Sequence, residues 1–291
     1  MHYPPPSATN KLLGYPSDAR LLIINADDFG MCQSTSAAIF RSLTEGIVCS
    51  TTLMVPCAWS PYAMQLLTEH PTIPFGIHLT AIGDSARYRW RPLSCRDEVS
   101  SLVDETGHFY SSDRSPEFLA KAKLVELEVE FRAQIETVLA ANLKPTHLDW
   151  HSIRIAKRPE LFDLMFKLAK EYGFALRVRE RSLIEKVQRQ DLPTNDYDFL
   201  DSYELETTDK SARYAKLLRD LPEGLSEWAV HPGLENAELL AIEPAGAAVR
   251  QADLDFLVSA QAREIIRQEG ITLLSYQPLQ EVWLASNTNM R

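Results

Sequence analysis

Short apolar segments alternate with amphipathic ones along almost the whole chain of 291 residues. Eight segments have the composition of strands: 21–25, 47–55, 75–80, 146–150, 175–179, 198–203, 227–231 and 271–275. Between them lie helical patterns at 34–45, 59–69, 116–141, 159–172, 208–220 and 253–269. Strands that alternate with helices pair in parallel, so the order predicts an α/β fold, a (β/α) barrel or a close variant. An open doubly wound sheet is the alternative, but no GxGxxG fingerprint follows the first strand.

Two stretches interrupt this alternation. Residues 81–115 follow the third strand and are too long for an ordinary connection, so we expect a long insertion that forms a lid or a small hairpin. Residues 232–252 are similarly long. Residues 1–18, which contain PPP, are expected to form an N-terminal arm, and residues 19–291 a single domain.

Composition excludes several classes of partner. The net charge is −10 and no run is rich in Lys or Arg, so we expect neither nucleic acid nor an anionic membrane as a partner. No apolar run is long enough for a transmembrane helix, and the first residues lack the apolar region of a signal peptide. The cysteines show no ligand-like spacing, which predicts reduced thiols and a cytoplasmic protein: Cys32, Cys49, Cys57 and Cys95. A homodimer is compatible with these features.

Titratable side chains recur at the carboxyl ends of the predicted strands. Asp27 and Asp28 follow the first strand, and His78 ends the third. His151 ends the fourth, and His231 ends the segment 227–231. Because the carboxyl ends of the strands in a (β/α) barrel converge on one face, we expect these side chains to lie close together.

The fourth strand places three such groups on one face. Side chains alternate along a strand, so His147, Asp149 and His151 share one face, while Leu148 and Trp150 pack outward beneath the helices. His147 lies deepest and fits a hydrogen-bonded core histidine. We expect His147 and Asp149 to support the ligands from behind, with the carboxylate orienting an imidazole.

One carboxylate and two imidazoles form a site for a divalent cation that leaves positions open for water and substrate. His78 and His151 are the candidate imidazole ligands because both end strands. The second carboxylate of the Asp pair can then take a proton from water, and His231 can protonate a leaving group, which suits hydrolysis of an amide or ester. The alternative is structural: taken alone, the Asp pair fits a solvated turn or a helix N-terminus.

Three further residues are candidates for substrate contact. Trp90 lies within the RYRWRP stretch of the insertion and could stack on a sugar ring. Arg250 and Asp253 are three residues apart, which predicts a salt bridge near the mouth of the barrel. An exposed pair that contributes little is the alternative.

In this order, the segments INADDFGM, GIVCSTTLMV, FGIHLT, KPTHLDWH and HPG resemble the YdjC-like carbohydrate deacetylases, the family of the chitooligosaccharide deacetylases. The resemblance extends from about residue 21 to the C-terminus. It implies a distorted or incomplete (β/α) barrel with a divalent ion, Mg²⁺ or Zn²⁺, held by Asp28, His78 and His151. It also implies that Asp27 is the general base and that His231 acts on the acid side. The implied substrate is an N-acetylated sugar or oligosaccharide that loses its acetyl group.

Two other functions remain open. A metal-dependent hydrolase of another bond, such as a phosphoester, would keep the barrel and the ion, but the strand-end motifs contain few basic residues to bind phosphate. A non-catalytic carbohydrate-binding protein with a vestigial site is the second, and the complete set of Asp and His residues disfavours it.

Overall fold

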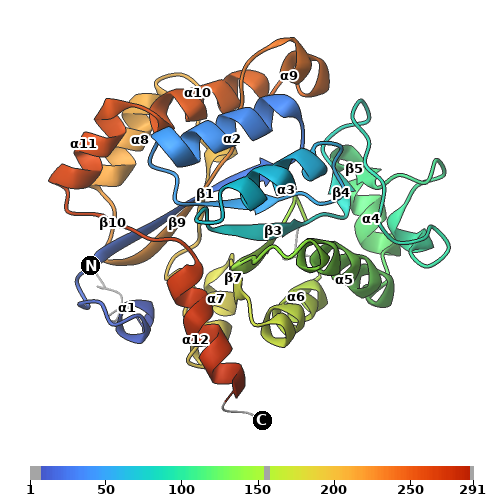
Figure 1. Cartoon of the computed structure of the whole chain (residues 1–291), viewed down its shortest axis with the longest axis horizontal. Helices are drawn as coiled ribbons and strands as arrows, with labels where there is room; N and C mark the ends of the chain where they lie inside the picture. The colour runs from blue at the N-terminus through green and yellow to red at the C-terminus, as the bar shows by residue number, and fades with distance from the viewer. Residues whose placement is uncertain (1–7, 154–157, 289–291) are drawn as a thin grey trace.

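The computed structural model describes residues 8–153 and 158–288, and it contains a curved parallel sheet surrounded by helices (Figure 1). The strands of this sheet are β1 (Arg20–Phe29), β2 (Ser50–Leu53), β3 (Phe75–Leu79), β6 (His147–Trp150), β7 (Ala175–Leu176), β8 (Leu200–Asp201), β9 (Gly224–Val230) and β10 (Thr272–Leu273). Each strand overlaps one of the eight predicted segments, so the predicted strand pattern is confirmed.

The strands form a half-barrel. They pair in parallel in the order β7-β6-β3-β2-β1-β9-β8, and β10 pairs only with the start of β1, outside this path. Among the described residues no pairing joins β7 to β8, so the barrel is incomplete, which agrees with the predicted fold class. Residues 194–196 lie beside the gap. There the Thr194 hydroxyl donates to the Leu176 carbonyl (3.0 Å), and the Asp196 N–H donates to the Leu225 carbonyl (2.8 Å).

Helices cover the outside of the sheet, and α2, α8, α10 and α11 pack together on one side of it while α5 and α6 pack on another (Figure 1). The helices are α1 (Ala8–Leu12), α2 (Gln33–Glu45), α3 (Ser60–Glu69), α4 (Ser115–Lys121), α5 (Leu124–Ala140), α6 (Pro159–Tyr172), α7 (Arg181–Gln188), α8 (Lys210–Arg219), α9 (Ala237–Ile242), α10 (Ala247–Leu257), α11 (Ala260–Gln268) and α12 (Gln277–Thr288). Helices α1, α7, α9 and α12 were not predicted.

Two predicted helices are each interrupted. The segment 116–141 forms α4 and α5, because Lys123 is extended and its N–H donates to the Ser101 hydroxyl instead of continuing the helix. The segment 253–269 contains the end of α10 and all of α11. Here Ser259 is extended, and its hydroxyl accepts from the Ala262 N–H, which caps α11.

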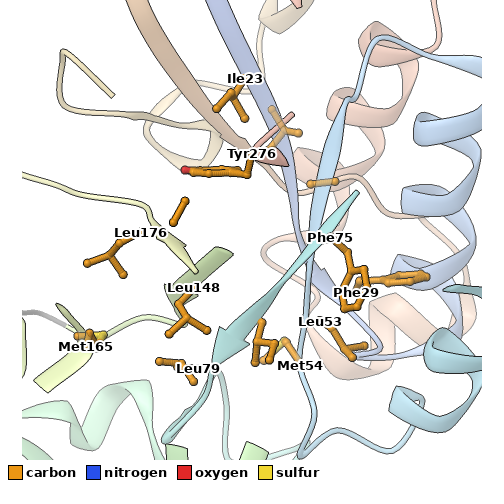
Figure 2. Packing of buried hydrophobic residues seen from close by; sticks show 14 of the residues in the cluster. Ile23, Phe29, Leu53, Met54, Phe75, Leu79, Leu148, Met165, Leu176 and Tyr276 are labelled. Atoms are coloured by element: carbon orange, nitrogen blue, oxygen red, sulfur yellow. The ribbon is translucent and has the colours of Figure 1, made fainter. Parts of the chain in front are cut away.

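Alternation along the strands separates apolar from polar side chains. Leu79, Leu148 and Leu176 belong to the buried hydrophobic core, on the side of the sheet where Met165 of α6 packs (Figure 2). The residues next to them in sequence therefore point to the opposite side, into the half-barrel. This opposite side holds the titratable side chains described below.

A short strand lies near each end of the insertion 81–115, and these two strands pair with each other. Strands β4 (Ile82–Gly83) and β5 (Tyr110–Ser111) run parallel, so this pair is not a hairpin, and the lid stays a prediction. An antiparallel bridge between Val103 and Phe109 surrounds a tight turn, and the 3₁₀ turns η1 (Ser100–Leu102) and η2 (Ser112–Arg114) complete the segment. A further 3₁₀ turn, η4 (Ser202–Glu204), follows β8.

Three other expectations concern the chain as a whole. The four cysteines are free thiols, as predicted. Of the predicted N-terminal arm, residues 1–7 lie outside the described residues. Helix α1 is tied to the body of the protein by the Thr9 hydroxyl, which donates to the Thr194 carbonyl (2.6 Å), and the boundary at residue 18 stays a prediction. Among the described helices, none combines the length and apolar character needed to cross a membrane.

Candidate metal centre

A cavity of about 980 Å³ opens at the carboxyl ends of the strands. Its lining includes all five strand-end residues predicted to converge: Asp27, Asp28, His78, His151 and His231. They come from four separate strand ends, so the predicted convergence on one face is confirmed.

Asp28, His78 and His151, hereafter the His–Asp triad, lie within reach of a single ion. Asp28 Oδ1 is 3.5 Å from His78 Nε2 and 3.3 Å from His151 Nδ1, and all three side chains are buried. Asp28 has a φ of 72°, a left-handed conformation that is strained for a residue with a Cβ. This turn at the end of β1 directs the carboxylate toward the two imidazoles.

Each imidazole of the triad is oriented by a second carboxylate. Asp149 Oδ1 lies 2.6 Å from His78 Nδ1, and Asp84 Oδ1 lies 2.7 Å from His151 Nε2. Because a carboxylate only accepts, each contact keeps a proton on that nitrogen and directs the other nitrogen of the ring toward Asp28. Asp149 occupies the orienting position predicted for it, whereas Asp84 was not predicted.

The triad fits a divalent cation. Asp28 Oδ1 is buried and receives no hydrogen bond, although two imidazole nitrogens face it. Burial alone lowers the pKa of an imidazole, but the carboxylates outweigh it. Asp149 raises the pKa of His78, and Asp84 with Asp28 raises that of His151 to about 10. The site therefore attracts positive charge, and its donor set of one carboxylate and two imidazoles suits Zn²⁺ and related ions.

Asp27 lies in a different environment from Asp28. Arg177 donates to both of its carboxylate oxygens (2.7 and 2.8 Å), and the Asn25 side-chain amide donates to Oδ1 (2.8 Å). Burial opposes ionisation, but Arg177 outweighs it and holds the pKa of Asp27 well below its usual range. Asp27 is therefore a deprotonated carboxylate at neutral pH.

Arg177 joins three buried carboxylates, and together with Asp27, Asp149 and Glu227 it forms what we call the arginine cluster. Its guanidinium lies 2.8 Å from Asp149 Oδ2 and 2.6 Å from Glu227 Oε1. The Tyr276 hydroxyl donates to the other oxygen of Glu227. Sequence reasoning missed Arg177, and the available signal was an arginine between apolar residues in a predicted strand.

His231 faces the same cavity from the end of β9. Its Nε2 lies 4.0 Å from Asp27 Oδ2, and its Nδ1 lies 2.8 Å from the Ser202 hydroxyl. The backbone N–H of His231 donates to Asp253 Oδ2 (2.9 Å). The ring is thus fixed at one nitrogen while the other is directed toward Asp27.

The predicted salt bridge between Arg250 and Asp253 is wrong, because among the described residues each pairs with other partners. Arg250 donates to Asp28 Oδ2 (2.7 Å) and to Glu243 (2.8 Å). Asp253 pairs instead with Lys210 (2.5 Å) and supports the backbone of His231. Both residues are buried, so neither is the exposed pair considered as the alternative. Arg250 lines the cavity, whereas Asp253 acts from behind it.

The remaining candidates are aromatic or lie deep in the sheet. Trp90 is buried, and its ring packs edge-on against His151 with centroids 5.4 Å apart. His147 stacks on Tyr276 (3.7 Å), and burial lowers its pKa well below the usual value, so it is a neutral core residue. A Cβ at Gly76 would lie 2.5 Å from this ring, so the adjacent strand requires glycine there. Trp150, predicted to pack outward, lines the cavity.

Several known proteins are similar to this chain in sequence or in structure. The family model described as "YdjC-like protein" matches residues 21–268. A carbohydrate deacetylase from Brevibacillus brevis is 32% identical over 263 residues, covering 89% of this chain and 99% of the relative. A chitooligosaccharide deacetylase from Yersinia enterocolitica is 32% identical over 160 residues, 55% of this chain and 59% of the relative. The crystal structure of a putative cellobiose-phosphate cleavage protein from Enterococcus faecalis superposes with a TM-score of 0.78 at 28% identity, covering 90% of this chain and 99% of that chain.

Proposed function

The chain belongs to the family of YdjC-like proteins, and on this premise we propose that it is a metal-dependent hydrolase that removes acetyl groups from N-acetylated sugars. One observation carries the proposal. A buried carboxylate oxygen of Asp28 has no hydrogen bond and faces two imidazole nitrogens that other carboxylates orient toward it. This arrangement supports a cation site in the cavity where the names of the relatives lead us to expect an acetylated carbohydrate.

Asp28, His78 and His151 would hold the ion. Two imidazoles among three ligands favour Zn²⁺ over Mg²⁺, which prefers oxygen ligands. When bound, such an ion supplies a Lewis acid that polarises the acetyl carbonyl and lowers the pKa of water. Arg250 donates to Asp28 Oδ2 and keeps Oδ1 directed toward the imidazoles.

Asp27 and His231 would move the protons. Asp27 is an ionised carboxylate on the lining of the cavity, and it would accept a proton from the water that attacks the acetyl carbon. His231 Nε2, 4.0 Å from Asp27, is placed to protonate the nitrogen as the C–N bond breaks. The products are acetate and a free amino sugar.

The cytoplasmic location and the homodimer stay predictions.

Acetate release tests this function. The full-length protein is assayed with N-acetylglucosamine and its oligomers before chelation, after chelation, and after Zn²⁺ or Mg²⁺ is restored. We expect release that chelation abolishes and metal restores, and an Asp97→Asn variant, changed at an exposed residue of the insertion, should match the wild type. Release that is unaffected by chelation would contradict the proposal. So would hydrolysis of phosphoesters without any N-acetylated sugar being cleaved.

A further inference from the structure

The two imidazoles of the His–Asp triad are oriented by different parts of the molecule. His78 is oriented by Asp149, which belongs to strand β6 of the half-barrel. His151 is oriented by Asp84, which follows β4 within the insertion 81–115. We propose that Asp84 is a positioning residue for His151, so that the insertion, and not the half-barrel alone, determines how tightly the metal ion is bound. This inference rests on the proposed function.

The contact geometry supports a specific role for Asp84. Its Oδ1 lies 2.7 Å from His151 Nε2, on the opposite edge of the ring from Asp28. In the neutral ring that binds a metal ion, accepting the Nε2 proton selects the tautomer in which Nδ1 keeps its lone pair, and Nδ1 is the nitrogen 3.3 Å from Asp28 Oδ1. Without this acceptor, either nitrogen of His151 can carry the proton.

The insertion holds Asp84 and the ring in place. The Ser112 hydroxyl donates to the Asp84 carbonyl (2.6 Å), which ties the two ends of the insertion together. Trp90, also within the insertion, packs edge-on against the His151 ring. Asp84 and Trp90, both from this one segment, therefore contact the His151 ring at two places.

Helix α5 anchors the insertion to the half-barrel. The carboxylate of Glu130, which is fully buried, accepts from the backbone N–H groups of Leu93 (3.1 Å) and Ser94 (3.0 Å). Glu126, one turn earlier, accepts from the Ser101 N–H (2.7 Å). These contacts make the insertion a fixed wall of the site in this structure, so Asp84 is held ready before any ion binds.

Zn²⁺ affinity of the chelator-stripped full chain tests the role of Asp84. Isothermal titration would compare the wild type with Asp84→Ala, Asp84→Asn and the exposed control Asp97→Asn. We expect roughly 10- to 100-fold weaker binding for Asp84→Ala, as for other residues that orient metal-ligating histidines. The loss should be smaller for Asp84→Asn, because the amide oxygen still accepts the Nε2 proton, and Asp97→Asn should match the wild type.

A second readout separates positioning from a general loss of structure. In ¹⁵N-histidine-labelled, Zn²⁺-loaded protein, the Nε2 proton of His151 should give the signal of a hydrogen-bonded proton in the wild type and in Asp84→Asn, and Asp84→Ala should lose this hydrogen-bonded signal. Unchanged Zn²⁺ affinity in Asp84→Ala would overturn the inference and leave the proposed function intact. If Asp84→Ala does not fold, Asp84→Asn decides: wild-type affinity with the Nε2 signal lost overturns the inference. A wild-type chain that binds no Zn²⁺ would overturn both.

Discussion

Asp27 and Asp28 are neighbours in sequence, both are buried, and yet their surroundings differ in one respect. In the arginine cluster, Arg177 supplies a cation of the protein's own to Asp27, Asp149 and Glu227. In the His–Asp triad, Arg250 reaches only Asp28 Oδ2, and Oδ1 receives no hydrogen bond. Burying a carboxylate is costly unless it is paired. Both oxygens of Asp27 are therefore occupied by the guanidinium of Arg177, whereas Oδ1 of Asp28 faces two imidazoles in an arrangement open to a metal ion.

Asp27, His78 and Asp149 also lie close enough together to bind an ion. Arg177 already donates to Asp27 and lies 2.8 Å from Asp149, so the guanidinium fills the position that a second ion would need. We therefore expect a single metal ion for each chain.

The largest expected effect comes from removing the charge of the Asp28 carboxylate. Asp28→Asn keeps the size of the side chain but removes the charge that faces the imidazoles, so deacetylase kcat/KM should fall by about 10⁴-fold or more. Steady-state acetate release measures this, with Asp97→Asn as the control. A variant within tenfold of the wild type would show that the triad is not the metal site.

Changing Asp27, the neighbour of Asp28, should reduce deacetylase activity without loss of the metal ion. Asp27→Asn removes the proposed base, so kcat should fall by roughly 10²- to 10⁴-fold while the protein still binds Zn²⁺. Acetate release and Zn²⁺ titration on the same preparation measure both properties. Wild-type kcat in this variant would remove Asp27 from the mechanism.

The arginine cluster should matter more for stability than a surface ion pair does. Arg177→Met leaves three buried carboxylates without their guanidinium, so the free energy of unfolding should fall by about 3–5 kcal/mol. Arg179→Met is the matched control, because Arg179 is 40% exposed and pairs with Glu204, and it should cost at most about 1 kcal/mol. Urea unfolding of the metal-free proteins measures both, and equal losses would contradict the comparison.

The insertion contains a further buried carboxylate, Asp104, whose partners all come from the protein itself. Asp104 pairs with Arg89 (2.5 Å) and accepts from Thr106; burial opposes ionisation, but these contacts hold the pKa of Asp104 well below its usual range. A lowered pKa stabilises the folded state above the unfolded pKa of about 3.9, and this contribution is lost as pH falls. Asp104→Asn should therefore cost on the order of 2 kcal/mol at pH 6.

We also expect the effect of Asp104→Asn on the free energy of unfolding to depend on pH. The difference in unfolding free energy between wild type and Asp104→Asn should narrow by about 1 kcal/mol between pH 6 and pH 3, as the unfolded wild-type carboxyl becomes protonated. Urea unfolding at the two pH values measures it. A difference that stays constant would show that the charge of Asp104 is not the stabilising feature.

Features encoded by local pattern could be predicted from the sequence. The eight strands follow from apolar runs between turn signals, and the convergence of Asp27, Asp28, His78, His151 and His231 follows from their shared position at strand ends. The long insertion was recognisable because it exceeds an ordinary connection. Even the break before α11 had a local signal, the capping hydroxyl of Ser259.

Features that depend on distant segments could not be predicted in the same way. Arg250 and Asp253 were expected to pair because they are close in sequence, but Arg250 reaches Asp28, 222 positions away. Asp84 and Arg177 were missed because their partners lie on other elements. Strand β10 pairs only with Leu21 and Leu22 of β1, outside the main strand order. Tertiary packing likewise determines this position.

The most direct test of the central claim is the metal content of Asp27→Asn and Asp28→Asn, measured by elemental analysis after Zn²⁺ loading and dialysis. We expect about one Zn²⁺ per chain in the wild type and in Asp27→Asn, and almost none in Asp28→Asn. Equal retention in both variants, or loss in Asp27→Asn alone, would contradict the division of roles between the two neighbouring aspartates.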